Sequence, residues 1–263
     1  MKIIELVKTE HSVKIGDDCP SIVPNIVEDT LFVSNGATVG FYLKNVGKYS
    51  KKALELSEIA NREFLSNRVP KTVMNRSTGY HEGTNVKQFS TIIGSIQARP
   101  HMRRPYNSIS AVHNKPSAKT FIKAMWLLAL EAENVMKDVA PDVYAKQKEI
   151  FDRHVDKKWR FGNIFTSSIS NFNIASGYHR DSGNIEGCAN VIITRRDNST
   201  GGNTTIPDYN ATVDSADGSI LVYPAWRNVH GVTPIIPTKA GGYRNSLVFY
   251  PLRAFVNKHE KTG

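Results

Sequence analysis

The N-terminal quarter of the chain alternates between short β-branched runs and residues that favour turns. Residues 3–7 predict one strand, and residues 30–33 and 38–43 predict a hairpin closed by the pair Asn35-Gly36. Between residues 51 and 65 the apolar side chains recur at helical spacing, which predicts an amphipathic helix.

The middle of the chain contains the clearest helical pattern. Residues 67–117 mix Gly, Ser, Asn, Pro and Arg, so we expect loops there around one short strand at residues 91–96. Ser117 has the residue type of an N-cap for a long helix, which carries one apolar face made of Phe121, Ile122, Met125, Leu128, Ala132, Val135, Met136 and Val139. Pro141 separates it from a second helix near residues 142–154, and we expect both helices to pack against one side of a sheet.

From residue 159 onward the pattern changes to short β-rich runs separated by glycine-containing turns. The runs cover residues 164–174, 189–194, 219–223, 229–235 and 244–250. Several short strands after a helical region predict an α+β fold, with a β-sandwich or barrel buttressed by helices. We expect one domain over residues 1–263, with strands, loops and supporting helices in 1–158 and the β-rich core in 159–254.

The composition adds a charge that the pattern does not show. The chain has 34 Lys and Arg against 24 Asp and Glu, a formal charge of +10, which favours an anionic partner and nucleic acid first. No apolar run approaches the roughly 18 residues of a membrane span, and charged residues follow soon after the start, so we expect no membrane partner. We expect an intracellular protein, in the cytoplasm, a host cytoplasm or the nucleus. Cys19 and Cys188 make a disulfide framework unexpected.

A candidate metal site lies in the β-rich half. Residues two apart in an extended segment point to the same side, so His179 and Asp181 can present an imidazole and a carboxylate to one ion. His230 lies in a later run that could pair beside this segment. Two histidines and one carboxylate form the facial triad of non-haem Fe(II) oxygenases. Zinc accepts the same ligand types, with hydrolysis as its chemistry, and competes for the site.

Two residues downstream favour iron. Arg244 and Ser246 are two positions apart on one predicted strand, so they share a face. The guanidinium could grip the distal carboxylate of a 2-oxoacid at two points, and the serine hydroxyl could donate a further bond. Arg244 also precedes an apolar run, where an unpaired charge is expensive.

Three strings then resemble the motifs of the TET/JBP family, over about residues 160–253. They are His179-Arg180-Asp181-Ser182-Gly183-Asn184, Thr194-Arg195-Arg196-Asp197-Asn198 and Arg244-Asn245-Ser246-Leu247-Val248-Phe249-Tyr250. Members of that family are Fe(II)- and 2-oxoglutarate-dependent dioxygenases that use O₂ to oxidise the methyl group of 5-methylpyrimidines in nucleic acid. The length of this chain is closer to that of the compact microbial or viral members than to that of the animal members. The resemblance implies a double-stranded β-helix core, of the jelly-roll or cupin type.

The resemblance also implies roles for single residues. His179, Asp181 and His230 would bind the iron, and Arg244 with Ser246 would hold 2-oxoglutarate. Asn184 matches an asparagine that helps read a flipped base, and Tyr250 matches a tyrosine of the same pocket. Two positions later the family has a histidine that bonds the cytosine edge, where this chain has Leu252. Leucine cannot make that bond, so 5-methylcytosine is the first expectation for the base and thymine the second.

A basic segment outside the β-rich half is the first candidate for gripping DNA. Arg99, Arg103 and Arg104 stand among prolines that stiffen the backbone, and Tyr106 could stack on a base. One of these arginines could instead reach the cosubstrate. Three readings compete: a monomeric DNA dioxygenase acting on a modified pyrimidine, a 2-oxoglutarate dioxygenase with a protein or small-molecule substrate, and a nucleic-acid-binding barrel that has lost its metal. The complete triad argues against the third.

Overall fold

The large sheet runs through most of the molecule. The computed structural model describes residues 1–74 and 86–257, and within them ten strands join in the order β1-β2-β3-β13-β9-β16-β7-β5-β4, with β6 beside β5. These strands are β1 Lys2–Glu5, β2 Thr30–Ser34, β3 Ala37–Leu43, β4 Thr72–Val73, β5 Phe89–Ile96, β6 Ser108–Ile109, β7 Ser167–Phe172, β9 Asn190–Asp197, β13 Ile220–Tyr223 and β16 Tyr243–Tyr250. The pairings are antiparallel, apart from the parallel pair β1 and β2.

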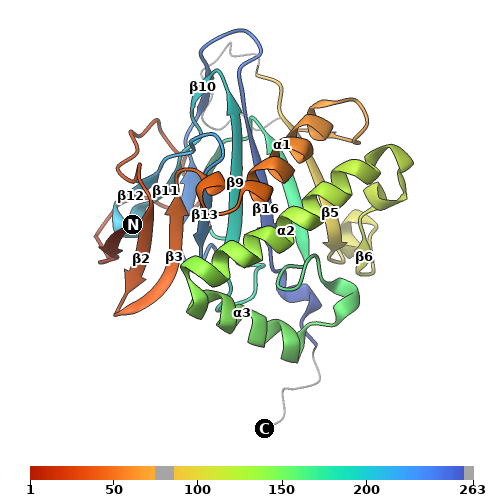
Figure 1. Ribbon diagram of the computed structural model, residues 1–263, viewed down its shortest axis with the longest axis horizontal. Coiled ribbons are helices and arrows are strands. Elements are labelled where there is room, and N and C mark those ends of the chain that lie inside the picture. Colours follow the sequence, from red (N-terminus) through yellow and green to blue (C-terminus); the bar gives the residue numbers. More distant parts are fainter. Residues whose placement is uncertain (75–85, 258–263) are drawn as a thin grey trace.

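A smaller sheet faces the large one. Its order is β12-β11-β14-β8, and a two-stranded ribbon, β10-β15, extends beyond it (Figure 1). Their bounds are β8 Ser176–His179, β10 Ser199–Gly201, β11 Thr204–Ile206, β12 Ala211–Val213, β14 His230–Val232 and β15 Ile235–Pro237. Two facing antiparallel sheets with helices outside form a jelly-roll core, so the predicted α+β double-stranded β-helix is confirmed.

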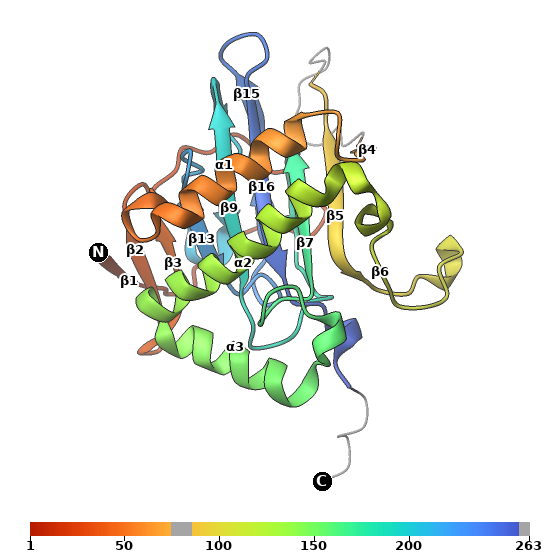
Figure 2. The same ribbon diagram turned by 45° about the vertical axis from the view of Figure 1, so that its right-hand side comes forward.

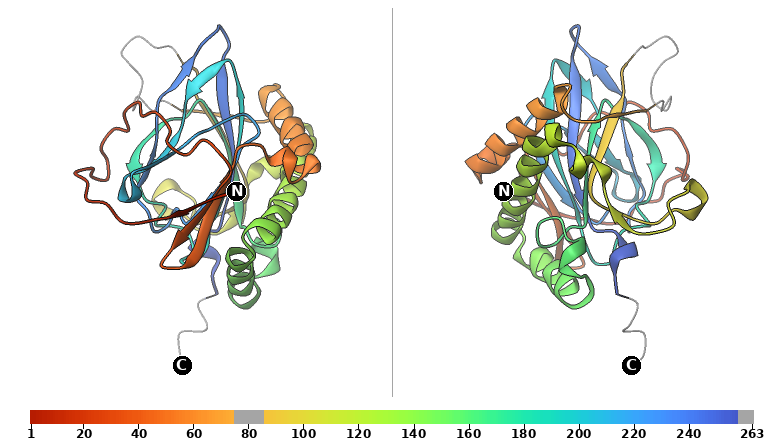
Figure 3. Two further views of the ribbon diagram at one scale, coloured as in Figure 1. Left: turned by 60° about the vertical axis from the view of Figure 1, so that its left-hand side comes forward. Right: turned by 90° about the vertical axis from the view of Figure 1, so that its right-hand side faces the viewer.

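Three helices cover the outer face of the large sheet, and they include the two that were predicted to pack on one side of it. They are α1 Lys51–Leu65, α2 Lys119–Val139 and α3 Pro141–His154, and Figures 2 and 3 show them together on the side away from the smaller sheet. The predicted N-cap is wrong. The Ser117 hydroxyl donates to the Arg68 carbonyl, and a 3₁₀ turn precedes α2, so Ala118 occupies the cap position. The 3₁₀ helices are Val46–Lys48, Pro100–Met102, Ala111–Asn114, Pro116–Ala118, Lys157–Trp159, Pro207–Tyr209 and Arg253–Phe255.

Strand β16 shows how the sheet separates its two faces. Asn245, Leu247 and Phe249 are buried toward the helices, where the two apolar residues join the main hydrophobic core. Alternate residues face the space between the sheets, namely Arg244, Ser246, Val248 and Tyr250. One strand therefore anchors the helices and also supplies one wall of a cavity.

The N-terminal strands extend the same sheet. The hairpin of β2 and β3 turns at Asn35 and Gly36, whose φ angles of 52° and 75° suit a tight two-residue turn, as the sequence predicted. β3 pairs with β13, which places the hairpin beside the β-rich half. In the described part of the chain, no helix is long and apolar enough to cross a membrane.

Candidate functional site

Two neighbouring strands of the smaller sheet bring the three predicted metal ligands together. β8 and β14 pair antiparallel, with His179 opposite His230. The imidazole centroids lie 4.3 Å apart, and His179 Nε2 lies 3.6 Å from Asp181 Oδ1. One ligand atom from each of these side chains lies within 4.8 Å of the others, so the group has the spacing of a metal site.

Backbone carbonyls fix the protonation pattern of both imidazoles. His179 Nδ1 lies 2.9 Å from the Gly177 carbonyl oxygen, and His230 Nδ1 lies 3.0 Å from that of Asn228. Because a carbonyl only accepts, each Nδ1 carries the hydrogen and each Nε2 keeps a lone pair for a metal. Burial lowers the pKa of His230 to about 4, so this ring stays neutral at physiological pH. The donor set fits a divalent metal such as Fe(II).

One asparagine bonds the Asp181 carboxylate, and a second asparagine bonds the first. Asn190 Nδ2 donates to Asp181 Oδ2 at 2.8 Å, and Asn184 Nδ2 donates to Asn190 Oδ1 at 2.8 Å. We call these three side chains the amide relay. The relay leaves Asp181 Oδ1 beside His179. Asn190 was not predicted from the sequence. The sequence marks Asn190 only as a polar residue at the start of an apolar strand. It lies two positions before Ile192, which also lines the cavity.

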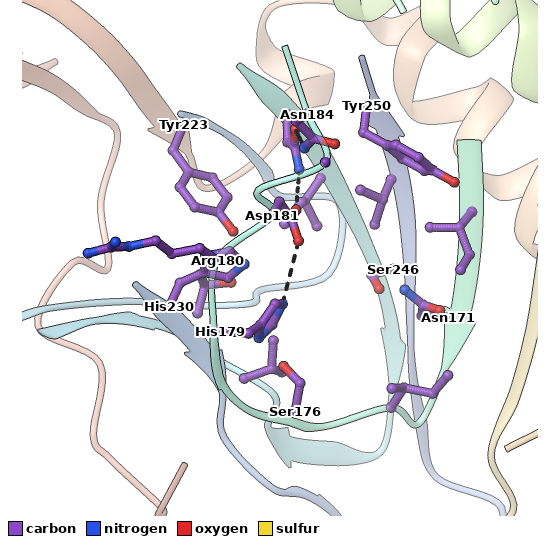
Figure 4. A pocket seen from close by; sticks show the side chains of 18 of the residues that line it. Asn171, Ser176, His179, Arg180, Asp181, Asn184, Tyr223, His230, Ser246 and Tyr250 are labelled. Atoms are coloured by element: carbon purple, nitrogen blue, oxygen red, sulfur yellow. Dashed lines mark hydrogen bonds and ion pairs between the residues drawn. The ribbon is translucent and has the colours of Figure 1, made fainter. Parts of the chain in front are cut away.

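The ligands line a cavity of about 400 Å³ between the two sheets. Tyr223, from β13, stands edge-on to His230 with ring centroids 5.3 Å apart. Figure 4 shows His179, Asp181 and His230 on one side of this space and Ser246 with Asn171 on the other. Of the described residues that line the cavity, Asp181 alone carries a carboxylate, so the opposite wall is free to receive an anion.

Arg244 and Ser246 form that opposite wall, as their spacing predicted. Both side chains are buried, Arg244 with only 2% of its surface exposed, and both line the cavity. Gly202 allows the arginine to lie there, because a Cβ at Gly202 would stand 2.5 Å from Arg244 Cδ. A buried guanidinium with a hydroxyl beside it fits the carboxylate of a 2-oxoacid.

Asn184, Tyr250 and Leu252 line another part of the cavity. Figure 4 shows Asn184 and Tyr250 near each other, beyond Asp181. Burial raises the pKa of Tyr250, and the Asp181 charge raises it further, so the hydroxyl stays protonated. The sequence grouped these residues correctly in space. The structure adds that the Asn184 amide nitrogen is engaged by Asn190.

Residues 97–107 form a loop that we call the basic loop, and Figure 2 shows it projecting from the body near β6. Arg99 lines the cavity, Arg103 is exposed, Arg104 is half-buried and Tyr106 is 79% exposed. The Arg99 amide donates to the Arg104 carbonyl at 2.6 Å, which closes a short hairpin. A further side-chain bond ties the loop to the Ala254 carbonyl. The structure thus places one predicted arginine at the cavity and the others outside it.

One solved structure has a similar fold over most of the chain, and two others match it less well. NgTET1 in complex with 5mC DNA is 13% identical, with a TM-score of 0.59 over 93% of this chain and 84% of that one. A 2OG-Fe(II) oxygenase family oxidoreductase from Burkholderia pseudomallei is 16% identical, with a TM-score of 0.47 over 76% of this chain and 81% of its own. OsALKBH1 is 15% identical, with a TM-score of 0.39 over 80% of this chain and 96% of its own. No curated protein sequence matches the chain.

A family match covers more than half of the sequence and includes every candidate ligand. Residues 96–253 match Tet_JBP, described as the oxygenase domain of the 2OGFeDO superfamily. The superfamily uses Fe(II), 2-oxoglutarate and O₂, in agreement with the donor set of His179, Asp181 and His230 and with the expected cofactors. The chain therefore belongs to the Tet_JBP family of 2-oxoglutarate- and Fe(II)-dependent oxygenases.

Proposed function

We propose that this protein hydroxylates the methyl group of 5-methylcytosine in DNA, giving 5-hydroxymethylcytosine as its first product. The observation that carries the proposal is the cavity itself. It combines a His-Asp-His group, a buried arginine with a serine, and a rim that continues into the basic loop. A DNA-methyl oxygenase needs these three features in one place.

The cofactor sites follow from the two walls of the cavity. His179, Asp181 and His230 would hold Fe(II), and Arg244 with Ser246 would hold the distal carboxylate of 2-oxoglutarate. When bound, the iron, the 2-oxoacid and O₂ together supply an oxidant strong enough for a methyl C–H bond. The protein orients the imidazoles through two carbonyls, and the two sheets form the walls of the cavity on either side.

The assignment of DNA as the substrate rests on two points, the access of a base to the cavity and the positive charge of the protein. In a duplex the pyrimidine methyl group projects into the major groove from a stacked base, so the base must be extruded, at a cost of a few kcal/mol, before the methyl can enter such a cavity. Asn184 and Tyr250 would contact that base, while Arg99, Arg103 and Arg104 would hold phosphates and Tyr106 would stack. The net charge of +10 and the likeness to NgTET1, solved with 5mC DNA, support this assignment.

Thymine in DNA is the second candidate substrate, and one residue favours it. Leu252 lines the cavity with an apolar side chain, which cannot hydrogen-bond the edge of a cytosine. An apolar wall discriminates poorly between a cytosine and a thymine edge. The base identity is therefore a separate question from the dioxygenase activity.

Mass spectrometry of nucleosides tests the proposal directly. Purified protein is incubated with Fe(II), 2-oxoglutarate and O₂, using matched duplexes with and without 5-methylcytosine, and a His179→Ala variant serves as the control. We expect 5-hydroxymethylcytosine from the methylated duplex alone. Only 5-hydroxymethyluracil, formed from both duplexes, would move the substrate to thymine. No product, together with no salt-dependent DNA binding, would exclude DNA and point to a protein or small-molecule substrate.

A further inference from the structure

Asn190 contacts two residues of the site, although the proposed reaction so far gives it no task. It begins β9, is only 3% exposed, and lies between Asp181 and Asn184 in the amide relay. It also lines the cavity. A buried carboxamide that bridges a metal ligand and a substrate-facing residue can make the orientation of one side chain depend on the other.

The chemistry of the relay allows only one direction of hydrogen bonding. An ionised carboxylate accepts and never donates, so Asn190 must turn its amino group toward Asp181. The Asn190 oxygen then faces Asn184, which must donate a hydrogen bond from its own amino group. The charge of Asp181 therefore sets the orientation of both amides.

The backbone around the relay leaves Asn184 little freedom to move away. Its amide donates to the Asp181 carbonyl at 2.9 Å, and it bridges to Leu252 in an isolated antiparallel pair. The next residue, Ile185, donates to the Pro251 carbonyl at 2.9 Å. On the other side of the relay, the buried Gln147 accepts from the Ala189 amide, next to Asn190. The segments that carry Asn184 and Asn190 are thus each held by other parts of the chain.

With its amino group turned to Asn190, Asn184 has its carbonyl oxygen left for the cavity. Within residues 1–74 and 86–257, that oxygen forms no hydrogen bond with the protein. An acceptor at this place suits a base edge that offers a donor. The exocyclic amino group of cytosine is such a donor, whereas thymine has a carbonyl in the same position.

We propose that Asn190 is a positioning residue that fixes Asp181 for the metal and makes Asn184 present an acceptor to the substrate. This inference rests on the proposed function and extends it to the choice of base. It predicts that the relay favours cytosine over thymine, which compensates for the missing contact at Leu252.

The first readout is metal affinity, which does not depend on turnover. An Asn190→Leu variant keeps the branched shape of the side chain and removes both hydrogen bonds. We expect its affinity for Mn²⁺ alone, measured by titration calorimetry, to fall about 10- to 100-fold, as is usual when the partner of a metal ligand is lost. The matched control is Asn61→Leu, which removes another buried amide bond, to Asn245, on the helix side of the large sheet. Its Mn²⁺ affinity should equal that of the wild type.

The second readout is the ratio of initial rates on duplexes that differ only in 5-methylcytosine or thymine at one position. Without Asn190, the Asn184 amide can rotate and offer either group, so we expect the ratio to shift toward thymine by about tenfold. Circular dichroism checks that the variant is folded. If Asn190→Leu does not fold, Asn190→Ser replaces it, because a serine cannot reach both partners.

The outcomes separate the two parts of the proposal. Mn²⁺ affinity equal to wild type in the folded Asn190 variant overturns the positioning role. Weaker Mn²⁺ binding with an unchanged base ratio overturns the coupling to Asn184. If the wild type oxidises neither base, the proposed function fails. The inference about Asn184 and the base fails with it, whereas the Mn²⁺ result still decides the role of Asn190 toward Asp181.

Discussion

The cavity between the sheets and the basic loop at its rim hold their polar side chains in different ways. In the cavity, Asp181 and Asn190 are fixed by side-chain bonds, and Arg244 is almost completely buried. In the basic loop, Arg103 and Tyr106 extend into solvent, and the bonds that order the loop are mostly made by its backbone. The difference separates two tasks, since a reaction needs fixed geometry whereas phosphate binding tolerates movement.

The largest expected effect tests the cavity. Replacing His179 or His230 with Ala removes one of the proposed iron ligands, so product formation should fall to the background of a reaction without the protein. Folding should survive, because both residues lie at the end of short strands outside the main core. Mass spectrometry and a thermal melt measure the two effects. A His11→Ala variant, altered outside the cavity, should keep full activity, and full activity in either ligand variant would remove the metal assignment.

Arg244→Ala comes next and tests the opposite wall. A bidentate, charge-assisted pair is worth roughly 3 kcal/mol, so the KM for 2-oxoglutarate should rise on the order of a hundredfold. The matched control is Arg195→Ala on the neighbouring strand, where the guanidinium contacts Asp217 and Glu58 instead. That change should lower the melting temperature and leave KM unaltered. An unchanged KM for Arg244→Ala would move the cosubstrate anchor to another residue, with Arg99 the next to test.

Smaller effects are expected in the basic loop. Arg103→Ala and Arg104→Ala should each weaken DNA binding by about 3- to 10-fold and lower the salt slope by about 1, because each removes one phosphate contact. Lys2→Ala, on the exposed edge strand β1, is the control of equal charge. Fluorescence anisotropy at several salt concentrations measures both quantities. Loop variants that bind DNA normally but have lost affinity for 2-oxoglutarate would assign these arginines to cosubstrate binding.

A pH titration gives the smallest effect and concerns the cavity alone. The unfolded chain protonates His230 near pH 6.5, whereas the folded, metal-free chain does so only near pH 4, since burial disfavours the charged ring. The unfolded state binds more protons between these values, so the free energy of unfolding should decrease as the pH falls through this window. Urea denaturation of the metal-free protein measures it. A His230→Gln variant should show a shallower decrease, and an equal slope would contradict the burial argument.

Hydrophobic periodicity was sufficient to predict the elements that build the core. The helix at residues 51–65 was predicted at its observed bounds, and the turn at Asn35-Gly36 was identified because few other residue pairs adopt two positive φ angles. The spacing of Arg244 and Ser246 predicted a shared face, which the structure confirms.

The smaller sheet was harder to predict. β8, β11 and β12 are only three or four residues long, so they are too short to show a hydrophobic pattern that identifies a strand. β8 and β11 pair with β14, which is distant in the chain, and β12 pairs with β11. Asn190 was missed for a related reason, because its importance lies in two tertiary hydrogen bonds and not in its neighbours along the sequence.

The alternation along β16 also limits how this chain can change in length. A deletion of a single residue inside the strand, at Asn245, would move every following side chain to the other face. Leu247 and Phe249 would then enter the polar cavity, while Ser246 and Val248 would face the helices. Such a deletion would damage chemistry and folding together, whereas one-residue insertions at the ribbon tip near Gly241 would be absorbed by the turn. Libraries that vary loop length should therefore place their changes at that tip.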